Sequence, residues 1–384
     1  MSKIQKNQKI LMINLPFSGH VNPTLPLAEC LVKRGHSVDY ICTEQFRQKI
    51  ENTGASFIPY SSFPKDPTEN EKKKLSFMAA FNTALEHKGE YDILIYEMFF
   101  YPGIKLAELL GIPCIRQFSQ PAWSDESAKD MSPVFRLSSI LIDAQVMGKK
   151  AIKDMNLSFK SMSDAIIHSK PDMNIVYVPE SFQKCRESFD DTFFYAVPKQ
   201  NISKSDVHIP YEMMKNPIIY IYIYISLGSI ISDKSFYKKC IRAFADKDVS
   251  VILNTGKISP DALGVIPENF YAYSFVPQIE VLQNTSVFLT HCGMNSVNEA
   301  ICAGVPMVAM PFVNDQIENA KQIDKLQIGR RIHSFPSRIK EIESSVFEVL
   351  SNPIYRDNVK KLQQEINLGN SWDVIIDRIE KLCY

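Results

Sequence analysis

The sequence predicts an α/β protein of two doubly wound, Rossmann-like domains that face each other across a cleft. Its 384 residues fit two domains of ordinary size. Apolar strands alternate with helical segments, as in βαβ units, and one polar, aperiodic stretch interrupts this alternation over 198–217. We expect an N-terminal domain over 1–205, a linker over 206–217, a C-terminal domain over 218–366 and a C-terminal helix over 367–384 that packs back towards the N-terminal domain.

The first half of the chain supplies the strands of one parallel sheet. They are expected at 10–15, 38–42, 57–59, 93–96 and 114–118. A helix should open at Asn22 and Pro23, because asparagine suits an N-cap and proline the first helical position. The polar stretches Ser61–Lys74 and Gln120–Ser132 are expected to be loops.

The second half repeats this pattern. Strands are expected at 218–225, 249–254, 270–274, 286–290 and 307–310, and closing helices at 338–350, 355–366 and 372–382. In the first of these strands isoleucine and tyrosine alternate strictly over 219–225, which places the two residue types on opposite faces of the sheet. We interpret it as a core strand whose phenol groups reach a polar rim.

Composition excludes several classes of protein. Lys plus Arg equals Asp plus Glu at 43 each, which disfavours a non-specific nucleic-acid binder. The eight cysteines include no Cys-x-x-Cys pair and are expected to be reduced thiols of a cytoplasmic protein. No apolar run approaches the roughly 18 residues of a membrane span, so we expect no integral membrane association.

Polar residues follow the predicted strands of both domains. Because ligands bind beyond the carboxyl ends of parallel strands, these segments should line one site. They are Ser18-Gly19-His20, Glu97, Ser226–Ser229, Phe275–Gln278, His291–Ser296 and Asn314–Gln316.

The segment from His291 to Glu299 has the chemistry of a diphosphate and ribose site. Gly293 allows close approach of the backbone, and Asn295 and Ser296 lie where a helix begins, so that free N–H groups attract an anion. His291 can donate to a phosphate oxygen, and Glu299 can accept from sugar hydroxyls. The chain has neither the Gly-x-Gly-x-x-Gly fingerprint after its first strand nor a P-loop, which disfavours a dehydrogenase or a P-loop NTPase.

These residues carry a resemblance. Val-Pro-Gln-x-x-x-Leu from Val276, Thr-His-Cys-Gly-x-Asn-Ser-x-x-Glu-Ala from Thr290 and Pro-x-x-x-Asp-Gln ending at Gln316 resemble the donor signature of the UDP-glycosyltransferase superfamily. Pro-Phe-x-Gly-His-x-Asn-Pro from Pro16 resembles the acceptor-side motif of its bacterial macrolide-type branch. The resemblance implies the GT-B architecture.

The resemblance also implies roles for individual residues. The donor would be bound by Ser229, Phe275, Val276, Gln278, His291, Gly293, Asn295, Ser296, Glu299, Asp315 and Gln316. His20 would be the general base, and Glu97 occupies the position of the aspartate that commonly orients this histidine. Asp92 begins the same strand, roughly 16 Å from the site edge at about 3.3 Å per residue, and is a poor substitute.

The implied activity is inverting transfer of a hexose from a UDP-sugar to a hydroxyl of a small, largely apolar acceptor, such as a macrolide or flavonoid. Gln316 favours glucose, and neither a metal nor another cofactor is expected. Aromatic residues of the N-terminal domain would line the acceptor pocket: Phe63, Phe100, Trp123 and Phe135. Two alternatives remain, a membrane-surface glycosyltransferase for a lipid acceptor and a non-catalytic helper protein that binds a sugar nucleotide.

Overall fold

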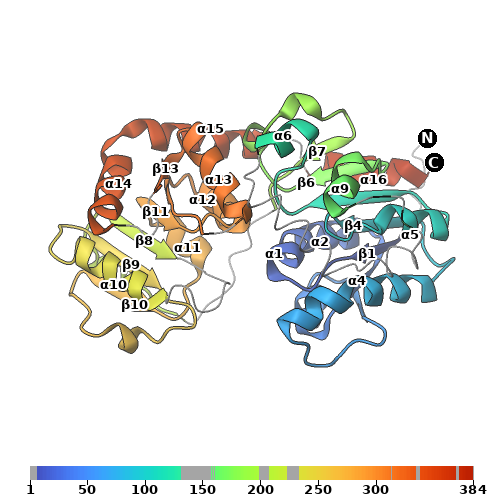
Figure 1. The fold of residues 1–384 in the computed structure, drawn as a ribbon, viewed down its shortest axis with the longest axis horizontal. Helices are drawn as coiled ribbons and strands as arrows, with labels where there is room; N and C mark the ends of the chain where they lie inside the picture. The colour runs from blue at the N-terminus through green and yellow to red at the C-terminus, as the bar shows by residue number, and fades with distance from the viewer. Residues whose placement is uncertain are drawn as a thin grey trace. The chain divides into compact units, whose positions relative to one another are not determined.

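The chain divides into two compact units, residues 1–198 with 369–384 and residues 199–368 (Figure 1). The computed structural model describes residues 7–130, 157, 159, 161–198, 207–222, 233–312, 314–333, 338–368 and 372–383. Each unit contains one parallel sheet with helices on both faces. None of the helices in these ranges is both long and apolar enough to cross a membrane.

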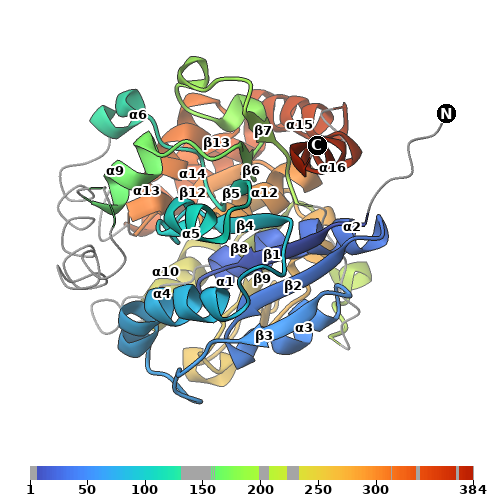
Figure 2. The same cartoon turned by 90° about the vertical axis from the view of Figure 1, so that its right-hand side faces the viewer.

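The first unit contains a parallel sheet of seven described strands in the order β3-β2-β1-β4-β5-β6-β7 (Figure 2). The strands are β1 Lys9–Ile13, β2 Ser37–Cys42, β3 Ser56–Pro59, β4 Ile93–Glu97, β5 Cys114–Phe118, β6 Met173–Val176 and β7 Phe193–Tyr195. β1 pairs with both β2 and β4. From β1 the sheet is extended on one side by β2 and β3, and on the other side by β4 to β7. The boundary between β1 and β4 is therefore the topological switch point, where open α/β sheets bind ligands.

Alternate residues of these strands face two helical layers. Ile10, Met12, Ile93 and Ile95 belong to a core formed with helices α2 (Leu25–Lys33), α3 (Arg47–Glu51) and α16 (Trp372–Glu380). The other helices described in this unit are α1 Ser18–Val21, α4 Glu69–Glu86, α5 Gly103–Leu110, α6 Asp125–Asp130 and α9 Met162–His168.

The C-terminal helix α16 packs within the first unit. Trp372 and Ile376 lie in the same core as Leu27 of α2. At its end, Glu380 lies 3.0 Å from Nε2 of the buried His36. Helix α16, near the end of the chain, therefore packs in the same core as β1 and α2, near its beginning.

Three expectations for this unit were wrong. The expected loop Gln120–Ser132 contains helix α6, Asp125–Asp130. Asn22 is not an N-cap: residues Asn22–Thr24 form a 3-10 turn that leads directly from α1 into α2. The expected loop Ser61–Lys74 contains the beginning of α4, where Thr68 and Glu71 form a reciprocal capping box. A capping box in the sequence indicates the start of a helix, but the charged residues that follow it do not show the apolar pattern of a helix.

The second unit has six described parallel strands in the order β10-β9-β8-β11-β12-β13. They are β8 Ile218–Tyr222, β9 Ser250–Asn254, β10 Phe270–Tyr273, β11 Val287–Thr290, β12 Met307–Ala309 and β13 Gly329–Arg331. The helices are α10 Asp233–Phe244, α11 Gln278–Gln283, α12 Met294–Ala303, α13 Asn314–Lys325, α14 Ile339–Ser351 and α15 Pro353–Leu368. The switch point here lies between β8 and β11.

The alternation in β8 separates two environments. Ile219 and Ile221 join a core with α10 and α14. Tyr220 stacks on Phe288 on the other face, with ring centroids 4.8 Å apart and planes 9° apart. Residues 223–225 of the expected strand lie outside the described residues.

Candidate active site

A histidine and a glutamate meet at the switch point of the first unit. His20 lies on α1, directly after β1, and Glu97 is the last residue of β4. Nδ1 of His20 is 3.0 Å from Oε1 of Glu97; the glutamate side chain is fully buried, while 23% of the histidine side chain is exposed. Although glutamate is one methylene longer than aspartate, its carboxylate therefore still lies beside the imidazole.

Two donors hold the buried Glu97 carboxylate. The Ser119 hydroxyl, just beyond β5, donates to Oε1 at 3.0 Å. The Phe99 backbone N–H donates to Oε2 at 2.9 Å. These hydrogen bonds replace water at a carboxylate that burial would otherwise destabilise. Asp92 lies at the opposite end of β4, where it accepts from the Lys9 backbone N–H at 2.8 Å.

The backbone and the ring of His20 are also held. Its carbonyl accepts from Nδ2 of Asn14 at 3.0 Å, and its N–H donates to the carbonyl of Phe17 at 2.9 Å. The rings of Phe17 and Phe99 lie 5.7 and 5.1 Å from the imidazole between centroids. Sequence reasoning missed Ser119, since only the order of strands in the folded sheet brings it to Glu97.

The second unit presents a helix N-terminus beside His291. α12 begins at Met294 after the cap residue Gly293, and no side chain caps it. Asn295 and Ser296 therefore occupy its first turn, as expected. First-turn N–H groups have no intrahelical partner and attract anions. The preceding residue, Cys292, has a φ of 67°, an uncommon conformation for a non-glycine residue that shapes this tight turn.

His291 is almost entirely buried, and burial lowers the pKa of its imidazole to about 4, opposed by a hydrogen bond to the Tyr222 backbone. The Tyr222 ring lies edge-on to it, at 5.8 Å. A Cβ atom at position 293 would lie only 2.8 Å from Nε2 of His291. Gly293 therefore makes room for the histidine side chain, a reason different from the approach to a ligand that its sequence suggested.

A hydrogen-bond network joins three of the predicted donor residues. Nε2 of Gln278 donates to Ser296 Oγ at 3.1 Å and to the carboxylate of Glu299. Oε1 of Gln278 accepts from the Tyr220 hydroxyl at 2.9 Å. Burial raises the pKa of Glu299, and the bond from Gln278 opposes this rise. Tyr220 and Tyr222 thus support the candidate site, whereas the sequence indicated only a core strand whose phenol groups reach a polar rim.

The remaining donor candidates lie along the same sheet edge. Phe275 follows β10 with 60% of its surface exposed, whereas the side chain of Val276 is buried. Asp315 and the buried Gln316 lie in the first turn of α13, and Oε1 of Gln316 accepts from the Phe312 N–H at 3.0 Å. Ser229 lies outside the described residues.

The acceptor candidates occupy different environments. Phe100 is fully buried, so its ring contributes packing in this structure. Phe63 is half-buried and meets Tyr60 edge-on at 5.2 Å. Trp123 meets Phe99, the neighbour of His20, at 5.9 Å. Phe135 lies outside the described residues.

Known proteins share both the signature and the fold. Residues 221–366 match the model of the family described as "UDP-glucoronosyl and UDP-glucosyl transferase". The NDP-glycosyltransferase YjiC of Bacillus subtilis strain 168 is 32% identical over 379 residues, which cover 94% of each protein. Demethyllactenocin mycarosyltransferase of Streptomyces fradiae is 26% identical, over 96% of this chain and 85% of the relative. The solved glycotransferase of kitacinnamycin superposes with a TM-score of 0.82 at 25% identity, over 99% of this chain and 100% of that one.

Two doubly wound parallel sheets with these relatives define a glycosyltransferase of the GT-B fold. The chain belongs to the UDP-glucoronosyl and UDP-glucosyl transferase family. The fold and family expected from the sequence are confirmed.

Proposed function

We propose that this glycosyltransferase moves a hexose, glucose in the first instance, from a UDP-sugar to a hydroxyl of a small, largely apolar acceptor, with inversion. The observation that carries the proposal is the contact between His20 and Glu97 at the switch point of the first sheet. A buried carboxylate beside one imidazole nitrogen fixes the tautomer that leaves the other nitrogen basic.

In the proposed reaction, Nε2 of His20 takes the proton of the acceptor hydroxyl as that oxygen attacks the anomeric carbon. The bond from carbon to the acceptor oxygen forms while the bond to the diphosphate oxygen breaks, and UDP leaves with the electron pair. A single displacement inverts the configuration at the anomeric carbon. Glu97 stabilises the imidazolium that results, and Ser119 and Phe99 N–H keep the carboxylate in position.

The donor is proposed to bind along the carboxyl edge of the second sheet. The open N-terminus of α12, with Asn295 and Ser296 in its first turn, suits the diphosphate. The exposed ring of Phe275 suits stacking on uracil, and the buried Glu299 suits the ribose hydroxyls. Asp315 and Gln316 would contact the sugar. This arrangement needs no metal, because backbone dipoles meet the charge of the leaving group.

The character of the acceptor is supported by what surrounds His20. The rings of Phe17 and Phe99 flank the imidazole and are only partly buried, so they offer apolar surface beside the base. The Streptomyces fradiae relative, named as a demethyllactenocin mycarosyltransferase, is consistent with a natural-product acceptor of this kind.

The test is product analysis by mass spectrometry. The protein is incubated with UDP-glucose, and in parallel with UDP-galactose and UDP-N-acetylglucosamine, against phenolic, flavonoid and macrolide acceptors. Glucosides formed fastest from UDP-glucose, undiminished by EDTA, are the expected result. Preference for another sugar would overturn the assignment of glucose, and loss of activity in EDTA that Mg²⁺ restores would overturn the metal-free mechanism.

A further inference from the structure

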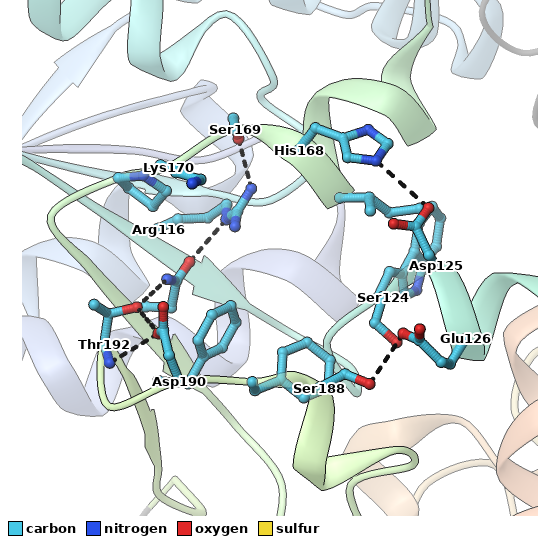
Figure 3. A pocket seen from close by; sticks show the side chains of 16 residues that line it. Arg116, Ser124, Asp125, Glu126, His168, Ser169, Lys170, Ser188, Asp190 and Thr192 are labelled. Atoms are coloured by element: carbon cyan, nitrogen blue, oxygen red, sulfur yellow. Dashed lines mark hydrogen bonds and ion pairs between the residues drawn. The ribbon is translucent and has the colours of Figure 1, made fainter.

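A pocket of about 340 Å³ lies in the first unit, and Trp123 is the one acceptor candidate among its lining residues. Arg116 of β5 and Asn174 of β6 line it, together with Ser124 and Lys170 from two loops and Ser188 from a 3-10 turn (Figure 3). Its volume falls in the range of roughly 300–1,000 Å³ that is typical of small-molecule sites.

The buried charge of this pocket is Arg116, of which only 2% is exposed. Its Nε donates to Oδ1 of Asn174 at 3.0 Å, and its Nη1 donates to the carbonyl of Ile166 and to Ser169 Oγ, both at 2.7 Å. All three acceptors are neutral. Among the described residues, none accepts a hydrogen bond from Nη2, and no carboxylate lies within ion-pair distance of the guanidinium.

A buried cation without a counter-ion is costly. Burial lowers the pKa of Arg116, and the side chains of Tyr96 and Cys114 oppose this effect, whereas no carboxylate of the described residues does. The guanidinium remains charged nevertheless, because the pKa of arginine is above 12. The missing negative charge is therefore one that a ligand in the pocket can supply.

The three carboxylates that line the pocket already have partners. Asp125 lies 3.4 Å from His168, Glu126 accepts from the Ser188 hydroxyl at 3.0 Å, and Asp190 accepts from the N–H and hydroxyl of Thr192. All three are exposed at the rim, where solvent screens their charge. Arg116 is consequently the buried charge among the lining residues, and the exposed Lys170 adds a second positive charge at the rim.

Aromatic side chains form the apolar walls. Trp123 lines the pocket, and the rings of Phe189 and Phe193 pack against each other at 4.8 Å. Flat apolar walls beside a guanidinium suit a ligand with an aromatic ring and one acidic group, since the ring replaces water at the walls while the acid pairs with the fork of donors.

We propose that this pocket binds a small aromatic carboxylate, with the carboxylate at Nη2 of Arg116 and the ring against Trp123, Phe189 and Phe193. The proposal does not depend on the sugar-transfer reaction, because neither His20 nor the donor site takes part in it.

The test uses the fluorescence of Trp123. Trp372 is the second tryptophan of the chain and lies in the core with α2, so Trp372→Phe leaves Trp123 as the single reporter. Benzoate is titrated against this variant, with the isosteric neutral amide benzamide as the control. We expect benzoate to change the emission of Trp123 and to bind at least about tenfold more tightly than benzamide. Equal affinities, or no binding of either probe by calorimetry, would overturn the proposal.

Two variants locate the binding. Arg116→Gln removes the charge and keeps hydrogen-bonding capacity, and it should abolish the preference for benzoate. Lys170→Glu reverses an exposed charge at the rim, and it should weaken benzoate binding even if Arg116→Gln fails to fold. Lys88→Glu makes the same change on the exposed turn after α4, outside the pocket, and should leave the affinity unchanged. Benzoate binding that tolerates Lys170→Glu as well as it tolerates Lys88→Glu would contradict the site.

Discussion

Nδ1 of His20 lies 3.0 Å from Oε1 of Glu97, and the glutamate is fully buried at the end of its strand. Burial and two hydrogen bonds fix the carboxylate, so its position does not depend on a bound acceptor. A glutamate can thus take the place of the aspartate that the family pattern leads one to expect. The non-catalytic alternative loses its main support, which was the unusual residue at position 97.

Substitution of Glu97 should reduce catalysis through His20. Glu97→Gln keeps the shape of the side chain but removes the charge that stabilises the imidazolium, and it should lower kcat about 10- to 100-fold, the equivalent of about 1.5–3 kcal/mol. Glu97→Asp should give a smaller loss, because the charge remains but is withdrawn by one methylene. Steady-state kinetics with matched circular dichroism checks both. Full activity of Glu97→Gln would show that His20 is oriented by another group.

The hydroxyl of Tyr220 should affect the proposed donor site without contacting the donor itself. Tyr220→Phe keeps the stack on Phe288 and removes the hydrogen bond to Gln278, so the KM for UDP-sugar should rise about 2- to 10-fold with little change in kcat. Tyr237→Phe is the matched control. It removes another buried hydroxyl, which donates to the Asn254 carbonyl, on the opposite face of the sheet. The control should lose stability alone; an equal rise in donor KM for both variants would contradict the role of Tyr220.

A single methyl group at position 293 should disturb His291. Gly293→Ala places a Cβ about 2.8 Å from Nε2 of the imidazole, which must then move. We expect UDP binding, measured by calorimetry, to weaken at least about tenfold, and stability to fall by about 1–3 kcal/mol, as for overpacking. Gly19→Ala, where a Cβ meets nothing within 4 Å, is the control and should keep its affinity for UDP. Unchanged UDP binding in Gly293→Ala would show that the imidazole does not contribute.

Burial of neutral His291 should make stability depend on pH. Its pKa is about 4 in the folded protein and about 6.5 when unfolded, so the unfolded chain binds more protons between these values. The contribution of His291 to the free energy of unfolding is fully present above about pH 6.5, and it should fall by about 3 kcal/mol as the pH drops to 4. His291→Gln should flatten this part of the curve. The difference between the two proteins in urea midpoint, measured from pH 7 to 4, isolates the histidine; a constant difference would contradict its neutral, buried state.

The sequence predicted the strands that carry the site because they are apolar and end in polar residues. It missed β6, β7 and β13, which are only three or four residues long and show no clear periodicity. His20, Glu97 and Gln278 were also predicted as site residues, because each of them follows a predicted strand. The contacts of these residues could not be predicted. Ser119 meets Glu97, and Tyr220 meets Gln278, only because of the order of strands in each sheet.

The central claim is that His20 is the general base of sugar transfer. The most direct measurement compares the wild-type protein with His20→Ala, following both glucoside formation and UDP binding. We predict that transfer falls about 10²- to 10⁴-fold, while the affinity for UDP, whose proposed site lies in the other unit, is unchanged. Transfer by His20→Ala at a rate close to that of the wild type would contradict the claim.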